Sequence, residues 1–195
     1  MQYSEGSFEW YKSVFDALLH DNMELYQNQY DAFQLLLNLN RDIPFKENKE
    51  VRQYAMQISK YVHEMADFVA GNTGSGKFND LYYKLLLLEA PYLLDSYMIY
   101  IEKNREPQAR FYLPRRKTLI RIVNKLQMLA DDELDELFIH LPGRTGKTQS
   151  ITEFNAWYAS KFPEKSNLYC SYSDAVAKSY YDGILELLTD PTYLH

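Results

Sequence analysis

Apolar residues recur at helical spacing through the first half of the chain. Three stripes share this spacing: Tyr26, Tyr30, Phe33 and Leu37; then Val51, Tyr54, Ile58, Val62, Met65 and Val69; then Leu94, Tyr97, Met98 and Ile101. Positions three or four apart fall on one face of a helix, so each stripe predicts an amphipathic helix. Pro44 and the run Gly71–Lys77 separate the helices, and Pro91 should kink or break the third. Residues 1–106 are therefore predicted to form a mainly α-helical N-terminal region.

The pattern changes near Pro107. A further helical stripe consists of Leu119, Ile122, Val123, Leu126 and Leu129. Next comes the short apolar run Leu137–Leu141, whose β-branched and aromatic content predicts a buried strand. A helix ending at Pro163, a second strand at Leu168–Ser171 and a helix capped by Ser173 complete the order. Strand, helix, strand, helix predicts an α/β fold over residues 107–195, with parallel strands and flanking helices.

Two glycine-rich segments could bind phosphate. The first, Gly71–Lys77, matches G-x-x-x-x-G-K but is followed by Phe78 where a magnesium-binding hydroxyl belongs. It also follows a helix, whereas a phosphate loop is delivered by a strand and opens into a helix N-terminus. We therefore interpret Gly71–Lys77 as a flexible connection between helices.

The second segment, Gly143–Thr148, has both the residues and the flanking pattern of a phosphate loop. Gly146 lets the backbone approach the phosphates, Lys147 can reach the β- and γ-phosphates, and the Thr148 hydroxyl can bind Mg²⁺. Leu141 occupies the position of the first consensus glycine, and Gly143 can supply the missing flexibility. The alternative is an ordinary strand-to-helix turn with a surface lysine.

Charge and composition narrow the function only slightly. The net charge of -6 does not favour nucleic acid, but one basic cluster carries no acid among its members: Arg110, Arg115, Arg116, Lys117, Arg121 and Lys125. The cluster is either a local nucleic-acid contact or a solvated helix face.

The only cysteine, Cys170, and the histidine His140 both fall in predicted strands, where they should be packed. No signal peptide or membrane-spanning run is apparent, which predicts a cytoplasmic protein without a membrane partner.

Several segments together resemble the large subunit of tailed-bacteriophage terminases, the motors that package viral DNA. They are Phe111–Arg116, the amphipathic helix after it, Leu141–Thr148, and Tyr172–Asp174. The phosphate loop of that family often reads Pro-x-Arg-x-Gly-Lys-Ser/Thr, as Pro142 to Thr148 does here. The upstream segments Leu88–Pro91 and Asp95–Tyr97 also look like the helical leader of some such subunits. The resemblance runs from about residue 80 to the end of the chain.

This resemblance implies ATP and Mg²⁺ as cofactors. Lys147 and Arg144 would be catalytic, with Arg144 beside the γ-phosphate, and Thr148 would be the Mg²⁺ ligand. The implied nucleotide-binding residues are Gly143, Arg144, Thr145, Gly146, Lys147, Thr148, Tyr112 and Arg115. Tyr112 would stack on adenine, although a core or rim aromatic is an equal alternative. The implied partners are double-stranded DNA, a small terminase subunit, the portal or capsid, and other copies in a ring, in the host cytoplasm.

One departure from the family bears on activity. A packaging ATPase needs an apolar strand ending in Asp-Glu after the loop, and residues 149–195 contain none. The acidic cluster of a nuclease is also absent. The chain therefore looks like the front part of such a subunit, with a truncated ATPase domain, and we expect it to be nearly inactive alone. Two alternatives remain: another P-loop enzyme, such as a helicase-like ATPase or small-molecule kinase, or a non-catalytic nucleotide-binding interaction module.

Overall fold

The computed structural model describes residues 3–192, and within them every regular element is a helix. The chain divides into two compact units, Met1–Glu89 and Ala90–His195, whose relative placement is not determined. The sequence instead predicted a boundary after Glu106. The segment between the two boundaries includes α5 (Leu94–Tyr100), which packs against helices of the second unit. The outer ends of both predicted domains, residues 1–2 and 193–195, lie outside the described residues.

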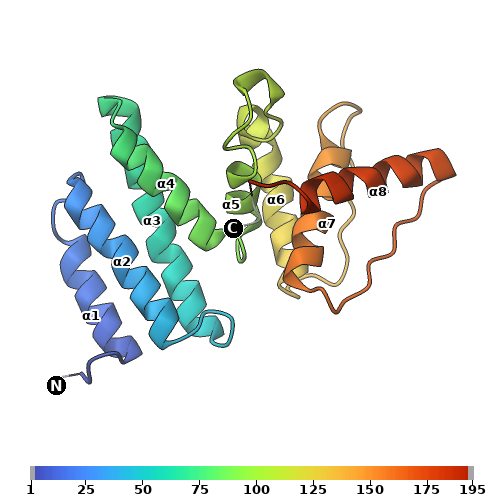
Figure 1. The fold of residues 1–195 in the computed structure, drawn as a ribbon. Helices are drawn as coiled ribbons and strands as arrows, with labels where there is room; N and C mark the ends of the chain where they lie inside the picture. The colour runs from blue at the N-terminus through green and yellow to red at the C-terminus, as the bar shows by residue number, and fades with distance from the viewer. Residues whose placement is uncertain (1–2, 193–195) are drawn as a thin grey trace. The chain divides into compact units, whose positions relative to one another are not determined.

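The first unit is a bundle of four helices, labelled α1–α4 in Figure 1. Their bounds are Phe8–Leu19, Tyr26–Asp42, Lys49–Thr73 and Gly76–Glu89. The first two predicted stripes contribute part of the core, since Phe33 and Val62 are buried, whereas Leu37 is exposed. Gly74 ends α3 in the left-handed conformation with φ +65°, so the connection to α4 is very short. The helical N-terminal region is thus confirmed.

A buried carboxylate joins α3 to α4 inside this bundle. Glu89, the last residue of α4, is fully buried and accepts a hydrogen bond of 2.6 Å from the Ser59 hydroxyl. The ring Nδ1 of His63 lies 2.8 Å from the same oxygen. Both partners come from α3, so a buried charge is matched by polar groups of the neighbouring helix. The cluster fixes the packing of the two helices.

The second unit contains α5, α6 (Arg116–Ala130), α7 (Lys147–Lys161) and α8 (Asp174–Leu188). The structure also forms short 3₁₀ turns at Pro107–Ala109 and Leu113–Arg115. Within this unit, α7 packs against α5, α6 and α8. Three helix predictions are confirmed: the amphipathic α6, the helix α7 that follows the glycine loop, and α8 with the Ser173 side chain as its N-cap. Helix α7 therefore lies at the centre of the second unit, in contact with its other three helices.

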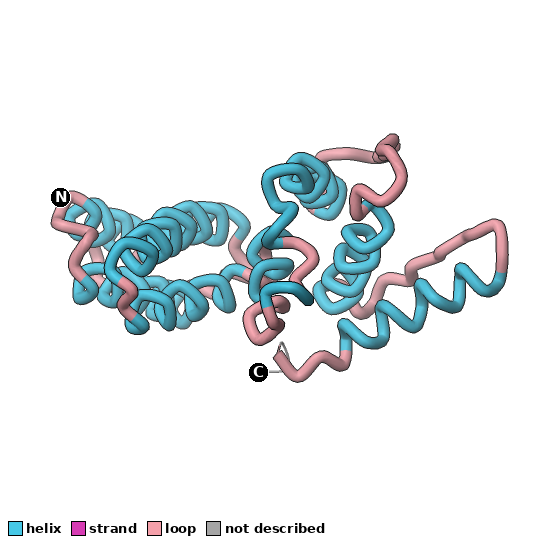
Figure 2. Tube along the Cα trace, turned by 90° about the horizontal axis from the view of Figure 1, so that it is seen from above, coloured by secondary structure: helices cyan, strands magenta, loops and turns pink. Residues whose placement is uncertain are grey.

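The predicted α/β fold is wrong. Neither Leu137–Leu141 nor Leu168–Ser171 forms a strand, and Figure 2 shows helices and loops only over residues 3–192. Both segments are loops at the surface, with Phe138 78% and Leu168 90% exposed. A parallel pair of strands is stable only in a larger sheet whose faces are covered. The described residues contain no strand with which either segment could pair. A short apolar run alone cannot supply those partners.

Two smaller predictions fail for the same reason. His140 and Cys170 were expected inside strands, and both side chains are exposed because their segments run over the surface. The second segment is nevertheless placed against α8, since the Tyr169 ring stacks on Tyr180 with centroids 3.8 Å apart. In the part of the chain that the structure describes, no helix is long and apolar enough to cross a membrane.

Candidate phosphate-binding site

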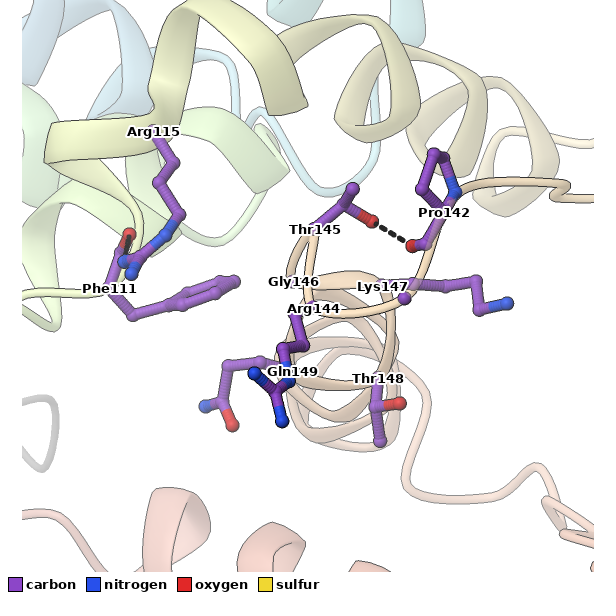
Figure 3. Close-up of a pocket in the computed structure, with 10 residues that line it drawn as sticks. Phe111, Arg115, Pro142, Arg144, Thr145, Gly146, Lys147, Thr148 and Gln149 are labelled. Atoms are coloured by element: carbon purple, nitrogen blue, oxygen red, sulfur yellow. Dashed lines mark hydrogen bonds between the residues drawn. The ribbon is translucent and has the colours of Figure 1, made fainter.

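The loop before α7 has a backbone suited to anions. Arg144 has φ 64° and Gly146 has φ 98°, while Thr145 between them does not have a positive φ. Such alternation turns successive backbone N–H groups toward one concavity. The loop is closed by the Thr145 hydroxyl, which donates a 2.9 Å hydrogen bond to the Pro142 carbonyl (Figure 3). A helix begins directly after the loop, as the sequence predicted, but the strand expected before the loop is not formed.

The N-terminus of α7 adds a second source of positive potential. Lys147 is the first residue of this 15-residue helix, and no side chain caps its N-terminus. The first N–H groups of an α-helix have no acceptor within the helix, and the helix dipole favours an anion there. Loop and helix together therefore present unsatisfied donors to the same place.

A pocket of about 340 Å³ lies over this loop. Ten residues line it, three of them cationic and none acidic: Phe111, Arg115, Pro142, Gly143, Arg144, Thr145, Gly146, Lys147, Thr148 and Gln149. Its size falls within the range of small-molecule sites. A concave site with excess positive charge and free backbone donors is suited to a phosphate-bearing ligand.

The structure brings together most of the residues predicted for nucleotide binding. The Gly143–Thr148 segment lines the pocket throughout, and Arg115 joins it from the other side. In Figure 3, Phe111 and Arg115 lie on one side of the loop, and the Lys147 side chain extends on the other. The lysine stem is flexible, so its ammonium group can follow a phosphate bound over the loop.

Tyr112 does not line the pocket. Its side chain is fully buried and its hydroxyl donates a hydrogen bond to Asp95. Arg116 binds both oxygens of the same carboxylate, at 2.9 and 2.6 Å. Burial first, and then the charge of Asp95, raise the pKa of Tyr112 well above its usual value. These contacts give Tyr112 and Arg116 a part in holding α5 to the start of α6.

Phe111 is the aromatic residue that reaches the pocket. Two atoms of its ring lie 2.7 Å from where a Cβ of residue 146 would stand, so only glycine fits there. Arg115 packs its guanidinium over the same ring, 5.4 Å from the centroid, and donates a 3.0 Å hydrogen bond to the Phe111 carbonyl. The sequence left Tyr112 either as a stacking ring or as a core aromatic, and its burial agrees with the core alternative. Adjacent residues outside a regular element have no periodicity that would show which of them points inward.

Two buried carboxylates behind the pocket were missed altogether. Glu102 is fully buried beneath the Phe111 segment, and Glu153 is fully buried on α7. Gln149, at the pocket, donates a 3.1 Å hydrogen bond to one oxygen of Glu153. The other oxygen has no hydrogen-bond partner among the described residues. Burial raises the pKa of Glu153 to about 7, and the nearby charge of Glu102 also raises it. Helical spacing could have placed Glu153 near the inner face, but nothing in the sequence marks Glu102.

The pocket could bind Mg²⁺ only together with a phosphate ligand. Thr148 supplies a hydroxyl at the pocket, and none of the ten lining residues is a carboxylate. Within residues 3–192 no group of three or more His, Cys, Asp or Glu side chains could hold a metal ion. Mg²⁺ usually keeps several waters and takes its remaining ligands from substrate phosphates. Thr148 would therefore hold an ion that arrives with the nucleotide.

The two neighbouring arginines should behave differently. Arg115→Ala should weaken Mg–ATP binding about threefold or more, because an exposed cation at the pocket is lost. Arg116→Ala should leave affinity nearly unchanged and instead lower stability by about 1 kcal/mol through loss of the Asp95 pair. Calorimetric titration and thermal melting of both variants would check this. Equal loss of affinity in the two variants would contradict the assignment.

Comparisons with known proteins add no identification. No family model matches the chain, and no match was found among curated proteins or solved structures. The function is therefore inferred from the geometry of the pocket and from the motif around it.

Proposed function

We propose that the second unit binds the polyphosphate of a nucleoside triphosphate, with Mg²⁺, at the Gly143–Thr148 loop. The observation that carries the proposal is the pocket over this loop, which combines left-handed backbone, a helix N-terminus and three cations without an acid. The base would lie toward Phe111, whose ring is large enough to stack on it. The phosphates would lie over the loop.

The wider role in this proposal is that of the N-terminal portion of a viral DNA-packaging motor of the terminase type. It is supported by the Pro142–Thr148 motif and by the order of the segments around it. ATP hydrolysis would drive DNA translocation in the complete motor, with DNA, a small subunit, the portal and other copies as partners. Exposed Lys117, Arg121 and Lys125, four residues apart along α6, offer a basic stripe for a phosphate backbone.

A titration with three ligands tests the binding proposal. Mg–ATP and inorganic tripolyphosphate with Mg²⁺ should both bind, because both present a polyphosphate to the loop. AMP should bind at least about tenfold more weakly, because it offers a single phosphate. Isothermal calorimetry on the intact chain measures all three. Equal binding of AMP and ATP, or no binding of either polyphosphate, would contradict the proposal.

Turnover by the isolated chain should be close to the uncatalysed rate. The pocket has cationic groups suited to phosphate but no lining carboxylate to orient the attacking water. Groups of that kind contribute about 10²–10⁴ in rate. Steady-state phosphate release by highly purified chain would measure this, with Lys147→Ala as the control for contaminating ATPases. Fast release that disappears in the Lys147 variant would show that a catalytic carboxylate does act at the site.

A further inference from the structure

Glu102 binds the backbone of the segment that forms one wall of the pocket. Its carboxylate accepts hydrogen bonds from three successive backbone N–H groups, those of Phe111, Tyr112 and Leu113, at 2.5, 2.8 and 3.0 Å. One side chain thereby fixes three residues in a turn that has only short 3₁₀ structure of its own. The position of this segment depends on a residue about ten positions earlier in the chain.

Because Glu102 is buried, its carboxylate depends on hydrogen bonds from the protein rather than from water. The side chain is fully buried, and Arg105 approaches it only to 3.9 Å. A buried carboxylate is tolerated when it is hydrogen-bonded, and three N–H donors satisfy both of its oxygens. Removing the carboxylate would leave those three N–H groups without their acceptor in a buried region. The segment would then be expected to move.

Movement of this segment would change the pocket on one side only. The Phe111 ring forms that side and packs against Gly146, and Arg115 depends on the Phe111 ring and carbonyl for its position. The loop on the other side keeps its own closing hydrogen bond between Thr145 and Pro142. Glu102 is therefore coupled to the ring-and-arginine side more directly than to the phosphate loop.

We propose that Glu102 is a positioning residue that holds Phe111 and Arg115 for the nucleoside part of the ligand. This inference rests on the proposed function and deepens it, because it separates recognition of the base from recognition of the polyphosphate. Glu102 does not line the pocket and acts through the backbone it binds. It therefore affects which phosphate compound binds rather than whether phosphate binds.

The test compares Mg–ATP with inorganic tripolyphosphate in Glu102→Gln. The glutamine keeps the shape but turns an NH₂ group toward backbone donors. We expect Mg–ATP affinity to fall about tenfold and tripolyphosphate affinity to stay within about twofold, since stacking of a base is lost and the loop is retained. Phe111→Ala should show the same split. The double variant should bind Mg–ATP at most about threefold more weakly than Phe111→Ala alone, because once the ring is gone Glu102 acts only through Arg115.

The outcomes separate the inference from the proposed function. Equal loss of both ligands would show that Glu102 serves only stability, and unchanged Mg–ATP affinity would show that it does not position the wall; either result overturns the inference. If the wild-type chain bound neither ligand, the proposed function would fail and the inference with it. If thermal melting shows that Glu102→Gln does not fold, Glu102→Asp carries the same test, because it keeps the charge and withdraws the carboxylate from the three N–H groups.

Discussion

Replacing Lys147 with alanine is expected to weaken Mg–ATP binding by about 10- to 100-fold. A hydrogen bond between charged partners contributes about 1.5–3 kcal/mol, which corresponds to that range in affinity. Lys147 begins α7, lines the pocket and has a stem long enough to follow the phosphates. Calorimetric titration of the variant against wild type measures the change, and circular dichroism should show an unchanged helix content.

Lys77 provides the matched control. It ends the other glycine-rich segment, but it lies in the first turn of α4, and its ammonium is 6.0 Å from the centre of the Tyr26 ring. No pair of left-handed residues precedes it in the way that Arg144 and Gly146 precede α7. Lys77→Ala should therefore leave Mg–ATP affinity within about twofold of wild type. An equal loss in both variants would refute the choice of loop.

Gly146→Ala should lower the stability of the second unit more than the same substitution at its other two glycines. A Cβ at this position would lie 2.7 Å from two atoms of the Phe111 ring, and the backbone φ of 98° is strained for any residue but glycine. Strain and overpacking together should lower the free energy of unfolding by about 2–4 kcal/mol. Denaturant unfolding would measure this loss, and Mg–ATP binding should weaken with it because loop and ring are pushed apart.

Gly143→Ala is the corresponding control within the same loop. No atom lies within 4 Å of the Cβ that this substitution would add, and the backbone there does not have a positive φ. Stability should therefore change by less than about 0.5 kcal/mol. A Gly143 variant as unstable as the Gly146 variant would mean that the contact with Phe111 is not what restricts residue 146.

The sequence predicted those parts of the fold that depend on local spacing. The stripe of Val51, Val62 and Val69 became the buried face of α3, and Ser173 caps α8 as its position before an apolar stripe suggested. Helix hydrogen bonds form between residues four apart, so such patterns contain most of what the helix needs. This explains why α2, α3 and the four helices of the second unit were recognised individually, although α1 and α4 were not.

The strands failed because their partners are not local. Leu137–Leu141 has the composition of a buried strand, but a strand is stable only beside another, and a short apolar run does not say whether one exists. In the structure the segment is a loop, and Phe138 is largely exposed. The pattern indicated a buried strand, and the structure has an exposed loop there instead.

The same difference between local patterns and distant contacts decided which residues of the candidate site could be predicted. Residues 143–148 were found because a phosphate loop is a continuous motif whose glycine and lysine positions can be recognised directly. Phe111 was passed over for Tyr112, and Glu102 was not considered, because both roles arise from a turn that folds back onto α7. Contacts between distant residues of that kind leave no periodic trace in the sequence.

Backbone-amide NMR of isotope-labelled chain, titrated with Mg–ATP, would show directly which residues contact the nucleotide. Amide signals of residues 143–149 should shift most, with smaller changes at Phe111 and Arg115, because the phosphates contact the loop and the first turn of α7. Signals of Gly71–Lys77 in the first unit should stay in place. Shifts confined to that segment, or no shifts at residues 143–149 at saturating nucleotide, would contradict the assignment of this loop as the phosphate-binding site.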